Sequence, residues 1–276
     1  MNKQEGKLYI VSTPIGNLDD ITLRAIKTLK EVDVIAAEDT RHSRRLLNHL
    51  AIQKPLTSYF QHNELSKSEQ LIKMLLAGKD VAIISDAGTP LISDPGYELV
   101  KAAISAGIDL VPIPGASAVL SILTVSGLKA ERFVFEGFVP REKKHRRRHL
   151  QKLAREERTM VFYEAPHRLC AFLADLKEIF GQRQLVVGRE LTKRFEEFKR
   201  GSVAEIQVYF SEHEPRGEFT IAVEGCPEFV QKVPTDEMLC SFAHELMSEG
   251  RSRKEAAQKL AKVYGLSVKK IYDLTL

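Results

Sequence analysis

Two acidic turns that are rich in glycine and proline follow an apolar run, and their residues are of types that could hold a ligand. The run 80–84, with the sequence DVAII, predicts a fully buried strand. Gly88 and Gly96 can adopt positive φ, whereas Pro90 and Pro95 fix φ and remove backbone donors. Such turns are rigid and present backbone groups outward, which suits a flat, polar cofactor.

A second interpretation applies to Asp94. The sequence Asp94-Pro95-Gly96 is also typical of a helix start, and a helix is predicted over 97–106. Under this interpretation the Asp94 carboxylate begins a helix and contacts no ligand. The sequence is compatible with both interpretations.

Strands and amphipathic helices alternate through the first part of the chain, so these turns are expected at one edge of a parallel sheet. An open α/β sheet binds its ligands outside the carboxyl ends of the strands. The predicted strands are 8–11, 32–36, 80–84 and 108–113, and the predicted helices are 23–29, 40–50, 66–76, 97–106 and 118–125.

The regular alternation of strands and helices does not continue after the first part of the chain. The predicted strands there are 132–138, 159–163, 184–188 and 219–223, with helices at 146–156 and 167–180, and the pattern beyond Pro234 is helical. We expect an α/β fold with two α/β domains, a cleft between them and a helical tail. The domains are an N-terminal α/β domain over 1–117, a C-terminal mixed α/β domain over 118–230 and a helix-turn-helix-like tail over 231–276.

Positive charge is concentrated in two segments, although the formal net charge is only +4. Residues 141–148 carry six lysines and arginines against one glutamate, and residues 251–270 carry seven against one. Nucleic acid is the polyanion that such segments suggest. Two solvated helix faces are the alternative.

The tail has the pattern of a helix-turn-helix. A helix is predicted over 255–264, and Ser267 is placed to cap a second helix after the turn at Gly265. The alternative is a three-helix cap that packs through Ala257, Leu260, Leu266 and Ile271.

Missing motifs exclude several function classes. No two glycines are separated by a single residue, which argues against a dinucleotide-binding fingerprint and a phosphate-binding Walker loop. His145 and His149 lie among arginines that would repel a cation, so no metal site is expected. The cysteines, Cys170, Cys226 and Cys240, are too far apart for a zinc site or a disulfide framework.

The composition is that of a globular protein with a sizeable core. Of the 276 residues, 43% are hydrophobic, but no apolar run approaches the ~20 residues that a membrane span needs. The N-terminus lacks the form of a signal peptide. We therefore expect a cytoplasmic protein with no membrane partner.

Five motifs occur in order over about residues 7–225. They are residues 12–22 (STPIGNLDDIT), 37–41 (AEDTR), 85–96 (SDAGTPLISDPG), 114–118 (PGASA) and 163–168 (YEAPHR). Together they resemble the tetrapyrrole methylase superfamily and, within it, the branch that methylates small-subunit ribosomal RNA. Five motifs in register make the resemblance highly specific.

The resemblance implies S-adenosylmethionine held between two α/β domains, a homodimer, and methylation of a cytidine ribose 2′-hydroxyl in the decoding region of 16S rRNA. Tetrapyrrole-modifying relatives carry Gly-Asp-Pro where this chain has Gly88-Thr89-Pro90, and this difference favours an RNA substrate. The implied cofactor-binding residues are Pro14, Ala87, Gly88, Thr89, Ile92, Ser117, Ala118, Tyr163, Leu191 and Thr220.

A ribose hydroxyl is a very weak acid, so a base or a nearby cation should assist its methylation. We take Asp39 as the candidate base, because it follows a predicted strand at the edge where ligands bind. Capping of the helix that begins near Thr40 is the alternative role of Asp39. The full set of candidates is Glu38, Asp39, His42, Asp86 and Lys193.

Two other functions are open alternatives to RNA methylation. One is a methylase of the same fold that acts on a small molecule or a protein, like diphthine synthase, and the other is a non-catalytic RNA-binding module. The basic segments argue against the first, and the intact cofactor motifs argue against the second. The predicted RNA contacts are Arg41, Arg146, Arg147, Arg148, Lys269 and Lys270.

Overall fold

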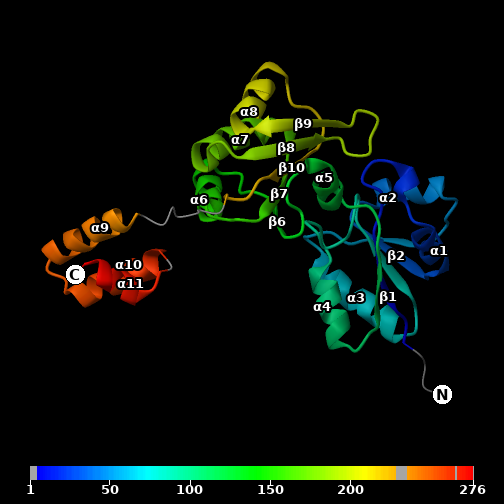
Figure 1. The fold of residues 1–276 in the computed structure, drawn as a ribbon. Helices are drawn as coiled ribbons and strands as arrows, with labels where there is room; N and C mark the ends of the chain where they lie inside the picture. Colours follow the sequence, from blue (N-terminus) through cyan, green and yellow to red (C-terminus); the bar gives the residue numbers. More distant parts are fainter. Residues whose placement is uncertain (1–4, 228–234, 265, 276) are drawn as a thin grey trace. The chain divides into compact units, whose positions relative to one another are not determined.

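The structure, a computed structural model, describes residues 5–227, 235–264 and 266–275. The chain divides into two compact units, Met1–Cys226 and Pro227–Leu276, and each is described by itself. Within the described residues, the first unit contains two five-stranded sheets with helices around them, and the second unit is helical (Figure 1). The predicted fold class, an α/β protein with a C-terminal helical tail, is confirmed.

The first sheet is parallel throughout, and its strand ends are aligned. Its order is β3-β2-β4-β1-β5, with β1 (Leu8–Val11), β2 (Val34–Ala37), β3 (Leu56–Ser58), β4 (Val81–Ile84) and β5 (Leu110–Ile113). Ile84, the last residue of β4, pairs with the last residues of β1 and β2, which are Val11 and Ala37. Val11 pairs in turn with Ile113 at the end of β5. The loops that follow these four strands therefore emerge side by side.

Both faces of this sheet are buried under helices. Alternate residues of β4 point to opposite faces, as strand geometry requires. Ala82 and Ile84 pack in the cluster that contains α1 (Leu23–Glu31) and α2 (Thr40–His49), whereas Val81 and Ile83 pack in the cluster that contains α3 (Glu64–Leu76) and α4 (Tyr97–Ser105). A parallel sheet covered on both faces needs apolar residues at every position, which explains the continuous run at 81–84.

The second sheet is mixed. Its order is β6-β7-β10-β8-β9, with β6 (Phe133–Phe138), β7 (Thr159–Glu164), β8 (Gln184–Arg189), β9 (Glu197–Ser202) and β10 (Phe219–Val223). β6 runs parallel to β7, and the remaining pairs are antiparallel. One face packs against α6 (Lys143–Leu153), α7 (Pro166–Phe180) and α8 (Val203–Glu212), and the other packs against α5 (Ala118–Ser126).

Helix α5 packs against the second sheet, which indicates where the first unit divides into two domains. Val119, Ile122 and Leu123 of α5 belong to the same apolar cluster as Val161 and Val186 of the second sheet. A short 3-10 helix (Leu18–Asp20) precedes α1 in the first half. Because α5 packs with the second half, we propose that the first unit divides between residues 117 and 118.

The second unit is a three-helix arrangement with its own apolar core. Its helices are α9 (Asp236–Ser248), α10 (Arg253–Tyr264) and α11 (Val268–Leu274). Ala257, Leu260 and Ile271 are buried in this core, and Leu266 packs against it. Ser267 caps α11 by accepting a hydrogen bond from the backbone N–H of Lys270 at 3.1 Å. Among the described residues, no helix has both the length and the apolar character needed to cross a membrane.

Candidate active site

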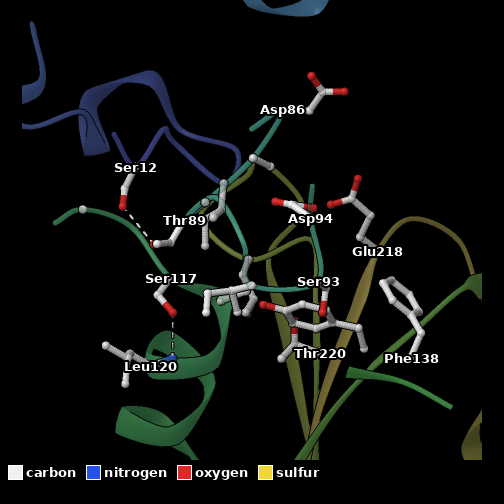
Figure 2. A pocket seen from close by; sticks show the side chains of 18 of the residues that line it. Ser12, Asp86, Thr89, Ser93, Asp94, Ser117, Leu120, Phe138, Glu218 and Thr220 are labelled. Carbon is white, nitrogen blue, oxygen red and sulfur yellow. Dashed lines mark hydrogen bonds between the residues drawn. The ribbon is translucent and has the colours of Figure 1, made fainter. Parts of the chain in front are cut away.

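A pocket of about 740 Å³ lies at the carboxyl edge of the first sheet, within the first unit (Figure 2). The loops after β1, β2, β4 and β5 form one side of it. The ends of β6 and β7, the loop after β8 and the start of β10 form the other side. Predicted cofactor residues that line it are Ala87, Gly88, Thr89, Ile92, Ser117, Ala118, Tyr163, Leu191 and Thr220. The predicted Pro14 is buried and lies outside the lining.

The loop after β4 is held close to the loop after β1. Thr13 and Gly88 exchange two backbone hydrogen bonds, of 2.8 and 3.1 Å, and the hydroxyls of Ser12 and Thr89 are 2.9 Å apart. Gly88 has φ of +81°, a conformation that glycine adopts without strain. A Cβ at this position would lie 3.3 Å from Cγ2 of Ile15. The turn therefore needs glycine for its backbone conformation and for the space beside it.

Backbone strain is concentrated in two loops of the pocket. Ile92 and Leu191 both line the pocket, and both are flanked by non-glycine residues with positive φ. Such conformations cost about 1–3 kcal/mol each and persist where the surrounding structure enforces them. The flanking residues are Leu91 (+73°), Ser93 (+70°), Glu190 (+50°) and Thr192 (+65°).

Helix α5 begins at the pocket. Ser117 is its N-cap, and the Ser117 hydroxyl accepts a hydrogen bond from the backbone N–H of Leu120 at 3.4 Å. The unsatisfied N–H groups of a helix start and the helix dipole attract a negative group. Ser117 and Leu120 lie at one end of the pocket in Figure 2, whereas the carboxyl groups of Asp86, Asp94 and Glu218 lie toward the other.

An aromatic wall closes the side formed by the second sheet. Tyr163 lies at the end of β7, and its ring centroid is 5.0 Å from that of Phe135 and 5.5 Å from that of Phe138. Thr220 of β10 pairs with Tyr163 across the sheet, which brings these two predicted residues together. Burial raises the pKa of Tyr163 to about 12, so its hydroxyl is neutral at physiological pH.

Carboxyl groups from two strand ends share the opposite side of the pocket. Glu38 follows β2 directly, and Asp86 and Asp94 follow β4. Burial raises the pKa of Glu38 to about 7, and the negative charges of Asp94 and Asp86 add to this rise. Burial also raises the pKa of Asp94 to about 6, a hydrogen bond from Ser85 opposes the rise, and the charge of Asp86 adds to it. The arrangement favours a cationic ligand group or a transferred proton.

Asp39 lies outside the pocket lining, so its predicted role as the base is revised. Its Oδ1 accepts a hydrogen bond from the backbone N–H of Arg41 at 2.8 Å, and its Oδ2 is 3.0 Å from Nη2 of Arg41. The hydrogen bond from the Arg41 side chain is the main cause that lowers the pKa of Asp39 to about 2. Asp39 is the N-cap of α2, as the alternative interpretation proposed.

The other candidate bases fall into two groups. Asp86 and Glu38 line the pocket, whereas His42 is exposed on α2 and Lys193 lies outside the lining. Nζ of Lys193 is 3.2 Å from Oε1 of Glu190 and 3.0 Å from Oε2 of Glu218. These carboxylates raise the pKa of Lys193 against the opposing effect of burial, which is the largest single cause. Lys193 is therefore a cation in an ion pair.

Sequence reasoning missed several pocket residues. Ser12 and Phe138 end or follow predicted strands, so the strand-end rule that selected residues 85–96 could have found them. Glu164 falls inside the motif at 163–168, yet no role was assigned to it. Glu218 precedes β10 at the amino end of that strand, and no sequence signal marked it.

Two arginines of the predicted RNA-binding run form ion pairs within the protein. Arg146 is only 5% exposed, and its Nη2 is 2.7 Å from Oδ2 of Asp175, which is itself buried. Arg147 pairs with Asp175 and Glu178. Arg148 is exposed. Because Arg146 and Arg147 face protein carboxylates, they are no longer expected to contact RNA, and Arg148 is the one residue of the three that stays a predicted contact.

The predicted contacts in the tail also differ from each other. Lys269 and Lys270 are both exposed on α11. Nζ of Lys270 is 2.9 Å from Oδ1 of Asp236 on α9, so its charge is partly satisfied within the second unit. Lys269 has no carboxylate partner among the described residues.

The pocket residues fit S-adenosylmethionine. The Gly88 turn leaves room for a flat group against the backbone, the Tyr163 wall offers an apolar surface, and the carboxyl group of Asp94 can face the sulfonium charge. The start of α5 is suited to a carboxylate. Across the described residues, no cluster of histidine, cysteine, aspartate and glutamate has the arrangement of a metal site.

Comparisons with known proteins agree with this geometry. Residues 7–207 match the family described as Tetrapyrrole (Corrin/Porphyrin) Methylases. The Ribosomal RNA small subunit methyltransferase I of Synechocystis sp. is 47% identical over 98% of this chain and 98% of its own length. The protein of the same name from Thermotoga maritima is 50% identical over 220 residues, which are 80% of this chain and 99% of its own length.

A solved structure shares the fold. The uroporphyrin-III C-methyl transferase of Thermus thermophilus, determined in complex with S-adenyl homocysteine, matches 79% of this chain and 97% of its own with a TM-score of 0.57 and 20% identity. Low identity limits this likeness to the fold. The sequence matches are stronger, and they confirm the predicted resemblance: the chain belongs to the tetrapyrrole methylase family and, within it, to the group of ribosomal RNA small subunit methyltransferase I proteins.

Proposed function

We propose that this chain transfers a methyl group from S-adenosylmethionine to the 2′-hydroxyl of a cytidine ribose in the decoding region of 16S rRNA. The observation that carries the proposal is the 47% identity, over nearly the whole chain, to a protein named for methylation of small-subunit ribosomal RNA. The pocket supports it, because the motifs of the chain converge there from both sheets.

In this proposal the backbone holds most of the cofactor. Ala87, Gly88 and Thr89 contact it through peptide groups, and the start of α5 at Ser117 and Ala118 binds its carboxylate. Ile92, Leu191, Tyr163 and Thr220 enclose the adenosyl group. When bound, S-adenosylmethionine supplies the reactive methyl carbon, so the chain needs no covalent nucleophile and acts by alignment.

The mouth of the pocket suits a nucleotide that has left its base stack. Phe138, Leu120 and Ile92 line the pocket and yet are 56%, 55% and 46% exposed. Exposed apolar side chains grouped at a pocket mark a binding surface. Single-stranded RNA is recognised by stacking its bases on such aromatic rings. We therefore assign Phe138 to the base and the acidic side of the pocket to the ribose.

Cations outside the pocket are the further RNA contacts that we propose within each unit. We include Arg148 and Lys269, which are exposed, and Arg41, whose ion pair with Asp39 lies at the surface and costs little to break. Such contacts would position the RNA through its phosphates. The proposal also includes a homodimer, a cytoplasmic location and the small ribosomal subunit as partner.

Neither alternative function accounts for both the pocket and the sequence matches. A non-catalytic RNA-binding module has no need of the turn at Gly88 or of the strained loops beside Ile92 and Leu191. A small-molecule or protein methylase would account for the pocket, but it leaves the high identity to the Synechocystis protein unexplained.

Methyl transfer from labelled S-adenosylmethionine tests the proposal directly. The purified protein should label 30S subunits or 16S rRNA, and nuclease digestion should place the label on one cytidine ribose. Parallel reactions with the assembled subunit and with naked rRNA identify the form of the substrate. Label on a nucleobase, or labelling of a tetrapyrrole instead of RNA, would contradict the proposal.

A further inference from the structure

Glu38 and Asp39 are neighbours in sequence with opposite surroundings. β2 ends at Ala37, a fully buried residue, and Glu38 is the first residue beyond it. Glu38 is half-buried and lines the pocket. Asp39 turns to the start of α2 and binds Arg41 there. The end of β2 therefore presents one carboxyl group to the pocket and one to the surface.

The proposed reaction requires a group that takes up a proton. A ribose hydroxyl holds its proton tightly at neutral pH, and attack of its oxygen on the methyl carbon becomes easier as that proton leaves. The acceptor must lie in the pocket and be unprotonated in a useful fraction of molecules. Among the described residues, the carboxyl groups that line the pocket are Glu38, Asp86, Asp94, Glu164 and Glu218.

Existing contacts separate these carboxyl groups. Oδ1 of Asp86 accepts a hydrogen bond from the backbone N–H of Asp39 at 3.0 Å. Glu218 pairs with Lys193. Glu164 is 2% exposed, and its Oε1 lies 3.1 Å from Nε of Arg168. Glu164 is therefore engaged in an ion pair with α7. Asp86, Glu38 and Asp94 have no ion-pair partner among the described residues, and each accepts a hydrogen bond from its neighbours. Burial raises the pKa of Glu38 and of Asp94, so these two pocket residues are the remaining candidates.

Burial and the negative charges around Glu38 bring its pKa close to neutral pH. Asp94 and Asp86 face it from the loop after β4, and Asp39 lies beside it. Together with burial, these negative charges raise the pKa of Glu38 to about 7, whereas that of Asp94 is raised to about 6. A base is most effective when its pKa lies near the working pH.

We propose that Glu38 is the catalytic residue that accepts the ribose hydroxyl proton during methyl transfer, an inference that rests on the proposed function. The hydroxyl oxygen forms a bond to the methyl carbon, the carbon–sulfur bond breaks, and its electron pair stays on sulfur. The hydroxyl proton moves to the Glu38 carboxylate and then to solvent. Asp86 and Asp94 act on this step through their charges.

The test compares Glu38→Gln with Asp39→Asn and Asp94→Asn under saturating S-adenosylmethionine and 30S subunits. Glu38→Gln should lower kcat by about 10²- to 10⁴-fold, the usual contribution of a positioned base. Wild-type kcat should rise with pH to a plateau above about 7, because Glu38 works unprotonated, and this rise should vanish in Glu38→Gln. Asp39→Asn, the matched control, should keep the wild-type plateau kcat and the pH-dependent rise, with a midpoint moved down only slightly because the Asp39 charge is the smallest of those that raise the Glu38 pKa.

Further measurements separate a base from a structural residue. Glu38→Asp keeps a carboxylate, so it should recover part of the activity and retain a pH-dependent kcat, whereas a structural role predicts equal loss in both variants. Calorimetry should give both variants an affinity for S-adenosylmethionine within a few-fold of wild type. Asp94→Asn should keep measurable turnover with a pH midpoint moved down, because a negative charge that raises the Glu38 pKa is removed.

Several outcomes would overturn the assignment. They are a wild-type kcat and pH profile in Glu38→Gln, equal inactivation by Glu38→Asp and Glu38→Gln, or loss of the pH-dependent rise in Asp94→Asn or Asp39→Asn instead. A wild-type protein that methylates no ribose in 16S rRNA would instead contradict the proposed function, so the two failures are distinguishable.

Discussion

The pocket edge and helix α6 both gather charges of one sign, but they differ in whether the fold neutralises them. On α6, Arg146 and Arg147 pair with Asp175 and Glu178 of α7. At the pocket, Glu38 and Asp94 approach Asp86 with no ion-pair partner among the described residues. The carboxyl groups respond by holding protons at higher pH than usual, as like charges in a partly buried site must.

Charges that stay unpaired in a pocket carry more information about function than a run of like charges on a helix. A dense basic run predicted an RNA surface, yet two of its three consecutive arginines stabilise the packing of two helices. The carboxyl groups are spread over the sequence and form no run at all. Charges that the fold leaves unpaired inside a pocket are therefore the better guide to chemistry.

The largest expected effect comes from filling the pocket turn. Gly88→Val should abolish detectable binding of S-adenosylmethionine, because a branched side chain near Ile15 occupies the space beside the turn. Calorimetry measures the affinity, and thermal unfolding checks that the protein still melts cooperatively. Gly107→Val is the matched control, since Gly107 also has positive φ but has no atom within 4 Å of its Cβ position. Unchanged affinity in Gly88→Val would remove this loop from the site.

Breaking the buried pair of α6 should have the next largest effect, on stability alone. Arg146→Ala leaves the buried carboxylate of Asp175 with only Arg147 at 3.3 Å, so the loss should approach the lower end of the about 3–5 kcal/mol that breaking a buried pair costs. Denaturant unfolding measures the loss. Arg148→Ala, the exposed neighbour, should change stability by less than about 0.5 kcal/mol and should weaken RNA binding in a salt-dependent way. Equal effects of the two substitutions on stability would contradict the distinction between them.

Removal of the tail should reduce activity without loss of the core. A chain that ends at Gln231 should fold and bind S-adenosylmethionine normally, because the pocket lies in the first unit. Methylation of 30S subunits should fall by about tenfold, mainly through weaker substrate binding, if basic residues such as Lys269 contact phosphate. Early melting of the truncated protein would favour the cap interpretation, and full activity with full stability would contradict both.

A smaller effect distinguishes Glu38 from Asp39 through the pH dependence of stability. The folded-state pKa of Glu38 is raised, so its stabilising contribution is present below the unfolded value near 4.5 and is lost as pH rises to about 7. At pH 8, Glu38→Gln should therefore be more stable than wild type by about 1 kcal/mol, allowing for solvent screening. The advantage should vanish near pH 4.

Asp39 should show the opposite sign. Its folded-state pKa is lowered to about 2 by Arg41, so its contribution is present above the unfolded value near 3.8 and is lost as pH falls toward 2. Asp39→Asn should therefore be no more stable than wild type at pH 8. Urea unfolding of the two variants between pH 4 and pH 8 measures both effects. A stabilised Asp39→Asn and a destabilised Glu38→Gln would contradict the environments described above.

The sequence predicted the elements that are buried on both sides. The strand at 81–84 is apolar at every position, so its pattern identified both the parallel sheet and the loop beyond it. β3 and β9 were not predicted. β3 has three residues at a sheet edge, and β9 has the polar sequence EFKRGS, so neither carries the hydrophobic pattern of a buried strand. Their pairing depends on neighbours that are distant in sequence.

The candidate site was predictable in outline but not in its charges. Strand ends and motifs selected Gly88, Ser117 and Tyr163, and all three line the pocket. The choice between Glu38 and Asp39 needed the structure, because it depends on which way each side chain turns after β2. The same holds for Arg146, whose partner Asp175 lies 29 positions away on another helix.

The most direct test of the account is the methylation state of 16S rRNA in cells that lack this protein. Mass spectrometry of the decoding region should find one cytidine without its ribose methyl group. Expression of the wild-type chain should restore the methyl group, and expression of Gly88→Val should not. A decoding region with its full set of ribose methyl groups in the deleted strain would contradict the account.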